Sequence, residues 1–300
     1  MANTIVAEAE LDDPDFGDIE IHSFVRTVLR RLRYDYVTLF FMGIILLIAA
    51  AAIFAPALAP YDPNQPAGML YRLKPIGFQG FVLGTDELGR DMLSRLIFGA
   101  RTSLLMGLTP VVIATIVGAA LGIVAGFMGG RINQAIMRTM DVFYAFPSVL
   151  LAVAISGTMG GGMGSGIVAL TIVFIPPLCR VAETASTQVR NLDYIEAARA
   201  SGAGSLNIIL HHVLGNILSP VLIYSSSLIS VAILLGAGLS FLGLGVEPPT
   251  SDWGLMLSSL RQAIYVQPLV CALPGLAIFI TSLSFNMVSD GLRQAMDIRA

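Results

Sequence analysis

The lengths of the uncharged apolar runs constrain most strongly what this chain can fold into. A helix needs about 20 apolar residues to cross the roughly 30 Å hydrocarbon layer of a membrane. Four uncharged runs reach this length: Tyr36–Tyr61, Thr102–Gly130, Ile217–Val246 and Gln262–Ser289. Because hydrophobic residues make up 55% of the chain and charged residues only 12%, each run predicts a transmembrane helix rather than the core of a soluble domain.

A fifth apolar run, Val142–Cys179, is too long for a single span. Its 38 residues would form a helix of about 57 Å at ~1.5 Å per residue, nearly twice the thickness of the layer. The glycine-rich stretch Gly157–Gly166 allows the chain to reverse there, and Pro147 is expected to kink the first of the two resulting helices. The chain is therefore predicted to be an all-α membrane protein with six transmembrane helices.

The basic residues indicate how these helices are oriented. An even number of spans puts both ends of the chain on one side of the membrane, and eleven of the 17 Lys and Arg residues then lie on that side. The positive-inside rule makes this side cytoplasmic. Residues 62–101 become an outer loop, and residues 183–216 become the longest internal cytoplasmic loop. No cleavable signal peptide is expected, because the N-terminus is acidic and the first apolar run is long enough to span.

Residues 1–35 are predicted to form an acidic cytoplasmic tail followed by a basic interfacial helix. Within Ile21–Asp35, apolar residues fall on one helical side and most arginines on the others, so such a helix can lie along the membrane surface. A cluster of arginines that only fixes the topology accounts for the same pattern.

The cytoplasmic loop differs in composition from the rest of the chain. Its first part is predicted to be a short helix that Asn191 caps and Gly202 ends. A second short helix is expected to begin near Ser205, with an apolar face at helical spacing. That face consists of Leu206, Ile209, Leu210, Val213 and Ile217. Two short helices around a glycine corner, with Ala197 and Ala198 permitting close approach, are typical of a protrusion that docks into another protein.

Residue types that often mark chemistry give no sign of it here. The two cysteines form no C-x-x-C pair, and His211 and His212 lack a third ligand at metal-binding spacing. The only lysine, Lys74, is not part of the Gly-Lys-Ser/Thr sequence of a Walker A loop. We therefore expect no metal site, no cofactor and no nucleotide site in this chain. The net charge of −3 says little, because seven of the twenty acids lie in the first twenty residues and the rest are spread thinly. We also expect no nucleic-acid partner.

Three classes of membrane protein have to be weighed. Secondary transporters usually carry ionisable groups deep in their spans, whereas Asp141, Glu183 and Asp290 lie near predicted cytoplasmic ends. An intramembrane enzyme needs a nucleophile and a base, or metal ligands, at one depth, and the serines of Tyr224–Ser230 have no such partner. A subunit of a primary transporter needs an ATPase on another chain, and the docking loop would supply that contact.

The loop sequence EAARASG, Glu196–Gly202, resembles the EAA loop of binding-protein-dependent ABC importer permeases, which has Glu-Ala-Ala, three variable residues and Gly. In that family the loop is a coupling helix that docks into a groove on a cytoplasmic ATPase. The resemblance implies the same role for residues 183–216, here called the coupling loop. The implied contact residues are Glu196, Ala197, Ala198, Gly202, Ala203, Gly204, Ser205 and Leu206. Further along, His212 and Gly215 depart from the family pattern.

Four further blocks resemble the dipeptide/oligopeptide/nickel branch of this family, and specifically its second (C-type) membrane subunit: Leu83–Leu105, Met137–Ala152, Gly238–Leu257 and Phe285–Asp297. This resemblance implies that residues 36–300 form a permease domain of the type I ABC importer fold in a bacterial cell inner membrane. The implied partners are a second homologous permease subunit, two cytoplasmic ATP-binding subunits, an extracytoplasmic substrate-binding protein and membrane lipid. Short peptides are the leading substrate, with nickel chelates, glutathione, opines and oligosaccharides as alternatives. The translocation path is left unassigned.

The outer segment before the second span has two interpretations. Asp91 and Arg95 are four residues apart and would be neighbours on one helical face, while Thr85, Asp86 and Glu87 are typical of a helix start. These residues either help to receive the substrate-binding protein or brace the outer end of the second span with a cap and ion pairs.

Overall fold

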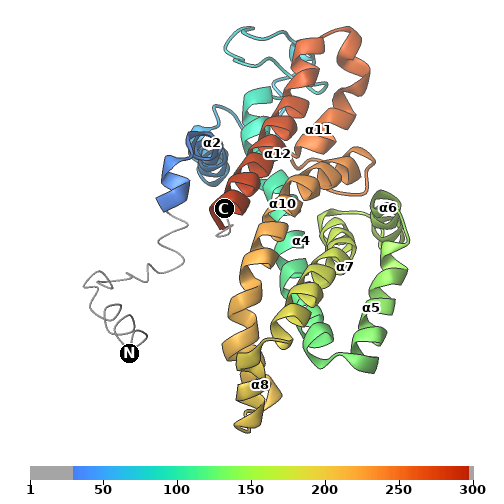
Figure 1. Ribbon diagram of the computed structural model, residues 1–300. Helices are drawn as coiled ribbons and strands as arrows, with labels where there is room; N and C mark the ends of the chain where they lie inside the picture. The colour runs from blue at the N-terminus through green and yellow to red at the C-terminus, as the bar shows by residue number, and fades with distance from the viewer. Residues whose placement is uncertain (1–29, 297–300) are drawn as a thin grey trace, which may run out of the picture.

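The structure, a computed structural model, describes residues 30–296, and the regular elements in this range are helices (Figure 1). Within these residues, five helical stretches are long and apolar enough to cross a membrane: α2 (Tyr36–Ile53), α4 (Met92–Met128), α7 (Met163–Arg190), the continuous stretch Ser205–Phe241 and α12 (Pro268–Met296). The helices α5 (Gly130–Tyr144) and α6 (Ser148–Thr158) are long and apolar enough only as a bent pair, which counts as a sixth, broken span when taken together. The prediction of an all-α protein with six spans is confirmed.

The third span is not the kinked helix that the sequence predicts. α5 and α6 meet at an angle of 88°, and residues 145–147 join them. Pro147 has no N–H to donate, and its ring disfavours a helical conformation of the preceding residue, which is compatible with a kink or a break. Here Pro147 has a ψ of 125°, outside the helical range, so the chain leaves the helix. The prediction also missed the first turns of α5, where Arg131 and Arg138 are exposed.

A line of glycines sets the close contact between α4 and α7. Gly118, Gly122 and Gly126 are spaced four residues apart on the face of α4 that meets α7. A Cβ atom at Gly122 would lie 2.7 Å from the Cβ atom of Ala182, and one at Gly126 would lie 2.5 Å from the backbone oxygen of Glu183. Small residues at this spacing let transmembrane helices approach through their backbones, which maximises van der Waals contact where no water is displaced.

Besides α8 (Asp193–Ala200), four shorter helices of the described residues lie outside the spans. They are α3 (Ala55–Leu58), η1 (Met69–Tyr71), α11 (Trp253–Ser259) and η3 (Leu260–Tyr265). α11 packs against the N-terminal part of α4, where the indole of Trp253 donates to the Leu96 carbonyl at 3.0 Å and the Ser103 hydroxyl donates to Asp252 at 2.7 Å. Burial raises the pKa of the Asp252 carboxyl, and the hydrogen bond from Ser103 opposes this rise. These contacts join the exit of the fifth span to the entry of the second.

Charged residues brace the N-terminal end of α4, but not in the predicted pairing. The expected pair between Asp91 and Arg95 is wrong, because Asp91 caps α4 while Arg90 and Arg95 contact Asp86 at 2.6 and 3.4 Å. The helix start predicted at residues 85–87 is also wrong, since α4 starts after Asp91. All four charged groups are buried, so the cap and the ion pairs stabilise one another away from solvent.

The first and last described helical segments lie together. Residues 30–34 are helical, and Leu32 packs against Ala295 near the end of α12. α2 then crosses α12 where Gly291 leaves room for Thr38. The two ends of the described chain thus lie close together, as an even number of spans requires if both are to be on one side of the membrane. Most of the basic interfacial helix predicted for Ile21–Asp35 lies outside the described residues.

Candidate functional site

The coupling loop contains the predicted glycine corner. α8 (Asp193–Ala200) ends in the manner typical of a helix followed by glycine: the N–H of Gly202 donates to the Arg199 carbonyl at 3.0 Å, and the N–H of Ala203 donates to the Ala198 carbonyl at 3.1 Å. Gly202 has a φ of +84°, a value that L-residues with a Cβ atom rarely adopt. The sequence therefore located the helix end correctly.

The cap predicted for the start of this helix is wrong. Leu192 occupies the N-cap position of α8 and makes no side-chain cap hydrogen bond, whereas Asn191 follows the last residue of α7. Only two residues, Asn191 and Leu192, separate the end of α7 from the start of α8. Asp193, in the first turn of α8, supplies negative charge at the positive end of the helix.

The residues with an implied docking role form an accessible surface. Six of the eight are exposed and two are partly buried. The exposed residues are Glu196, Ala197, Gly202, Gly204, Ser205 and Leu206, and the partly buried ones are Ala198 and Ala203. Leu206 exposes 70% of its surface, so its side chain is accessible to a partner.

The coupling loop is anchored to the helices behind it. Ile195 is fully buried in a cluster that includes Phe127 of α4 and Ile217 of the fifth span. The guanidinium of Arg199 lies over the Phe127 ring, 5.0 Å from its centroid, which adds a cation–π attraction. A force applied to the exposed side of α8 therefore reaches two membrane-spanning helices directly.

The second short helix is in fact the start of the fifth span. α9 (Ser205–Ile208) continues through the π-helical turn η2 (Ile209–Val213) into α10 (Leu214–Phe241). A π-helical turn holds more residues than an α-helical one, so it shifts the phase of the apolar face. Ile208, Val213 and Ile217 are buried, while Leu206 and Leu210, which the regular helical spacing predicted to share that face, are exposed.

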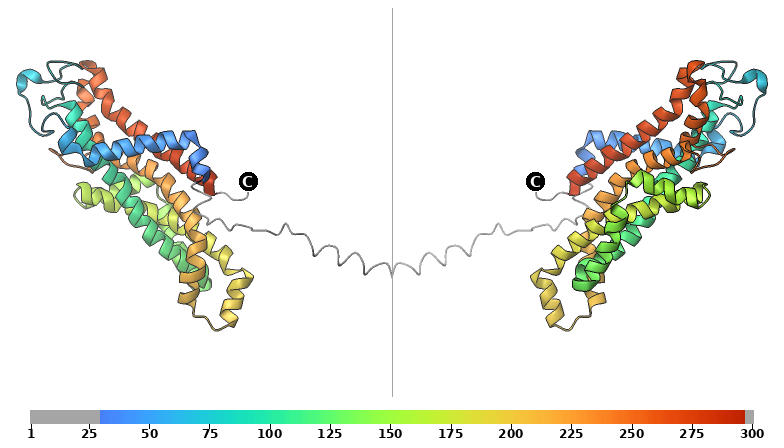
Figure 2. Two further views of the ribbon diagram at one scale, coloured as in Figure 1. Left: turned by 90° about the vertical axis from the view of Figure 1, so that its left-hand side faces the viewer. Right: turned by 90° about the vertical axis from the view of Figure 1, so that its right-hand side faces the viewer.

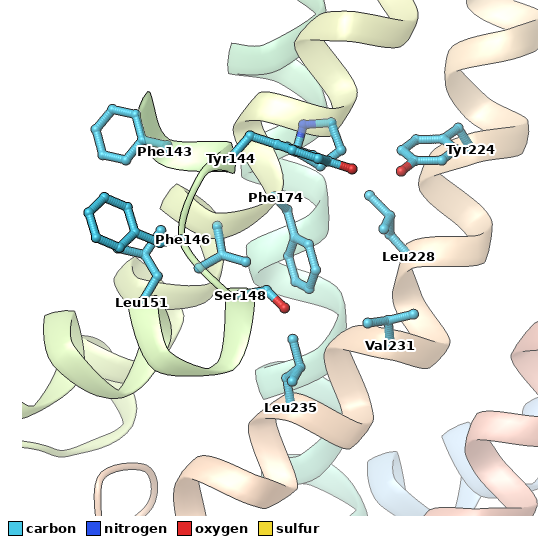
Figure 3. Close-up of a pocket in the computed structure, with 12 residues that line it drawn as sticks. Phe143, Tyr144, Phe146, Ser148, Leu151, Phe174, Tyr224, Leu228, Val231 and Leu235 are labelled. Carbon is cyan, nitrogen blue, oxygen red and sulfur yellow. The ribbon is translucent and has the colours of Figure 1, made fainter. Parts of the chain in front are cut away.

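A cavity of about 310 Å³ lies beside the break between α5 and α6 (Figure 3). Its lining comes from the ends of both helices, from α7 and from α10. The lining residues are Phe143, Tyr144, Phe146, Ser148, Leu151, Val173, Phe174, Pro177, Tyr224, Leu228, Val231 and Leu235. None of these is charged, and the hydroxyl groups of Tyr144 and Tyr224 point toward one another across the cavity (Figure 3).

An ion pair closes one side of the break. Arg180 of α7 contacts Asp141 of α5 at 2.5 Å, and its guanidinium lies 5.5 Å from the ring centroid of Tyr144, a residue of the cavity. Both charged side chains are about half exposed, so solvent screens the pair. No residue of this cavity was predicted as a site residue, and the aromatic run before Pro147 is the local sequence signal for it.

Comparison with known proteins gives two family matches that together span most of the chain. Residues 118–300 match the family described as "Binding-protein-dependent transport system inner membrane component". Residues 23–75 match the "N-terminal TM domain of oligopeptide transport permease C".

Curated relatives and solved structures agree with these matches. The "Di/tripeptide transport system permease protein DppC" of Pseudomonas aeruginosa is 46% identical over 256 residues, which is 84% of each chain. The "Glutathione transport system permease protein GsiD" of Pectobacterium atrosepticum is 38% identical over 284 residues, 95% of this chain and 94% of that one. A chain of the MetNI methionine ABC transporter in an inward-facing conformation has the same fold, with a TM-score of 0.56 at 20% identity, over 68% of this chain and 97% of that chain. The chain belongs to the family of binding-protein-dependent transport system inner membrane components, the membrane permeases of ABC importers.

Proposed function

We propose that the chain is the C-type permease subunit of an ATP-driven importer of short peptides in a bacterial inner membrane. Both termini lie in the cytoplasm, residues 36–300 form the permease domain, and residues 1–35 form a tail and an interfacial helix. A second homologous permease subunit, two ATP-binding subunits and an extracytoplasmic substrate-binding protein complete the importer. One observation carries the proposal: an exposed glycine-cornered loop is anchored to the spans of a chain that belongs to this family.

The coupling loop docks on the ATPase, which hydrolyses ATP on another chain. On the inner side of the loop, Ile195 lies in the same buried cluster as Phe127, and Arg199 lies over the Phe127 ring. The exposed residues of Glu196–Leu206 remain available for the ATPase. Movement of the ATPases on binding ATP is thereby transmitted to α4 and the fifth span. ATP shifts the assembly between an inward-facing and an outward-facing conformation only to the extent that it binds one of them more tightly than the other.

The cavity beside the α5–α6 break forms part of the translocation path. An apolar and aromatic lining accepts side chains of many kinds, and the Tyr144, Tyr224 and Ser148 hydroxyls can pair with the backbone groups of a peptide. The absence of charge among the twelve lining residues fits a site that binds its cargo weakly and passes it on. Selection among peptides is then left to the substrate-binding protein.

Uptake by the complete importer in proteoliposomes tests the substrate. Labelled dipeptides and tripeptides should accumulate in a manner that needs ATP and the binding protein, whereas the purified chain alone should show no ATPase activity above background. Glutathione is the second candidate, because a glutathione permease is 38% identical over 95% of this chain. Uptake of glutathione without uptake of α-linked peptides would replace the peptide assignment, and ATP hydrolysis by this chain alone would remove the importer assignment.

A further inference from the structure

A groove between α2 and α4 has no role in the functions discussed so far. It is lined by Ala49, Ala52, Ile53, Arg101, Leu104, Leu105 and Leu108, and its volume is about 330 Å³. Six of these seven residues are aliphatic, and Arg101 supplies the only charge. The groove thus combines an apolar channel with one basic group.

The geometry of α2 accounts for the groove. At its beginning α2 is held against α12, where Thr38 fits the space beside Gly291, and Figure 2 shows the two helices crossing. Toward its other end α2 lies beside α4, and the small side chains of Ala49 and Ala52 do not fill the space facing Leu104 and Leu108.

Arg101 lies where the hydrocarbon layer is expected to end. It directly precedes the uncharged run that begins at Thr102, and its side chain is exposed. In the described part of the chain Arg101 has no ion-pair partner, because the buried acid Asp86 at this end of α4 contacts Arg90 and Arg95. A free guanidinium at this depth is placed to meet a lipid head group.

We propose that the groove binds an anionic phospholipid, with an acyl chain against the leucines and the phosphate on Arg101. A guanidinium matches a phosphate through two parallel hydrogen bonds, and basic pockets between transmembrane helices bind anionic head groups. A peptide would not suit the groove, since its backbone groups would find no partners among aliphatic side chains. A lipid would fill the space and hold α2 against α4.

Native mass spectrometry of the complete importer, exchanged into equal amounts of phosphatidylglycerol and phosphatidylcholine, tests this proposal. The wild-type complex should retain phosphatidylglycerol preferentially. Arg101→Gln should lower that retention by about fivefold, the effect of one basic residue near an anionic group. Arg261→Gln is the matched control, because Arg261 is exposed in η3 but is not part of the groove, and it should change nothing.

Two further variants separate the proposal from its alternatives. Ala49→Leu fills the groove without changing its charge and should also lower the retention of phosphatidylglycerol. If lipid were only attracted to basic residues in general, Ala49→Leu would retain as much phosphatidylglycerol as the wild type, and that result would overturn the proposal. Equal retention by wild type and Arg101→Gln would overturn it as well. Cross-linking of Leu105→Cys to the second permease subunit in the membrane would show that a protein surface, rather than lipid, covers the groove.

Discussion

Valine at Gly202 should uncouple the importer through backbone strain alone. Gly202 has a φ of +84°, and nothing lies within 4 Å of a Cβ atom built there, so a Cβ atom meets no crowding within this chain. The left-handed conformation costs an L-residue about 1–2 kcal/mol, and strained conformations reach about 3 kcal/mol. Because ~1.4 kcal/mol corresponds to a tenfold change in population, the observed corner should become roughly 5 to 150 times less populated relative to alternative loop conformations.

The same position offers a graded series, and Gly204 offers a control. Asparagine tolerates positive φ better than other residues, so defects should increase from Gly202→Asn through Gly202→Ala to Gly202→Val. Gly204 is also exposed with open space around it, but its φ is −68°, so Gly204→Val adds the same side chain without the strain and should be tolerated far better.

The assay is ATP-driven uptake by the reconstituted importer, with membrane insertion and assembly measured in parallel. Gly202→Val should insert at near-normal levels and lose uptake. Equal losses with Gly204→Val would attribute the defect to bulk on the docking surface and refute the argument from φ. Normal uptake by Gly202→Val at equal expression would mean that residues 183–216 only connect two spans.

Three further predictions concern the coupling loop, the contact between α4 and α7, and the orientation in the membrane. Glu196→Ala should reduce uptake less than Gly202→Val, because it removes one exposed polar contact without bending the backbone; an equal loss of uptake would contradict this ranking. Gly122→Ala should lower the free energy of unfolding of the purified protein by about 1–3 kcal/mol through overpacking, and with it the melting temperature. Gly43→Ala, where a Cβ atom has open space, should lower neither. Equal melting temperatures of the Gly122→Ala variant and the wild type would argue against the close contact between α4 and α7. An impermeant thiol reagent applied to intact cells should label a cysteine at Asn64 but not one at Ser205, both exposed positions, and the reverse pattern would invert the orientation.

The sequence predicted the elements that depend on length or on local backbone chemistry. Spans are limited by the thickness of the layer, so uncharged runs located α2, α12 and most of α4 to within about ten residues. The corner at Gly202 was predictable because a positive φ favours glycine through local sterics.

Features that depend on distant contacts could not be predicted. At the 88° break, α5 and α6 contact α7, and α6 also contacts α10, whereas a proline alone does not distinguish a kink from a break. The π-helical turn in Ile209–Val213 has no sequence signature, so the face predicted from regular spacing was wrong at Leu206 and Leu210. The cavity gathers side chains from residues 143 to 235, and only the folded chain brings them together.

The glycines between α4 and α7 also restrict how sequences of this kind can diverge. A Cβ atom at Gly122 or Gly126 would meet Ala182 Cβ or the backbone of α7, and no change of rotamer can move those atoms. A single substitution there must be followed by displacement of a whole helix, which would disturb many other contacts at once. On the opposite side of α4, Val112 and Ile116 are exposed and can exchange for other apolar residues one at a time. Among related sequences, we therefore expect substitutions to accumulate on the exposed side of α4 and to be rare on the side that faces α7.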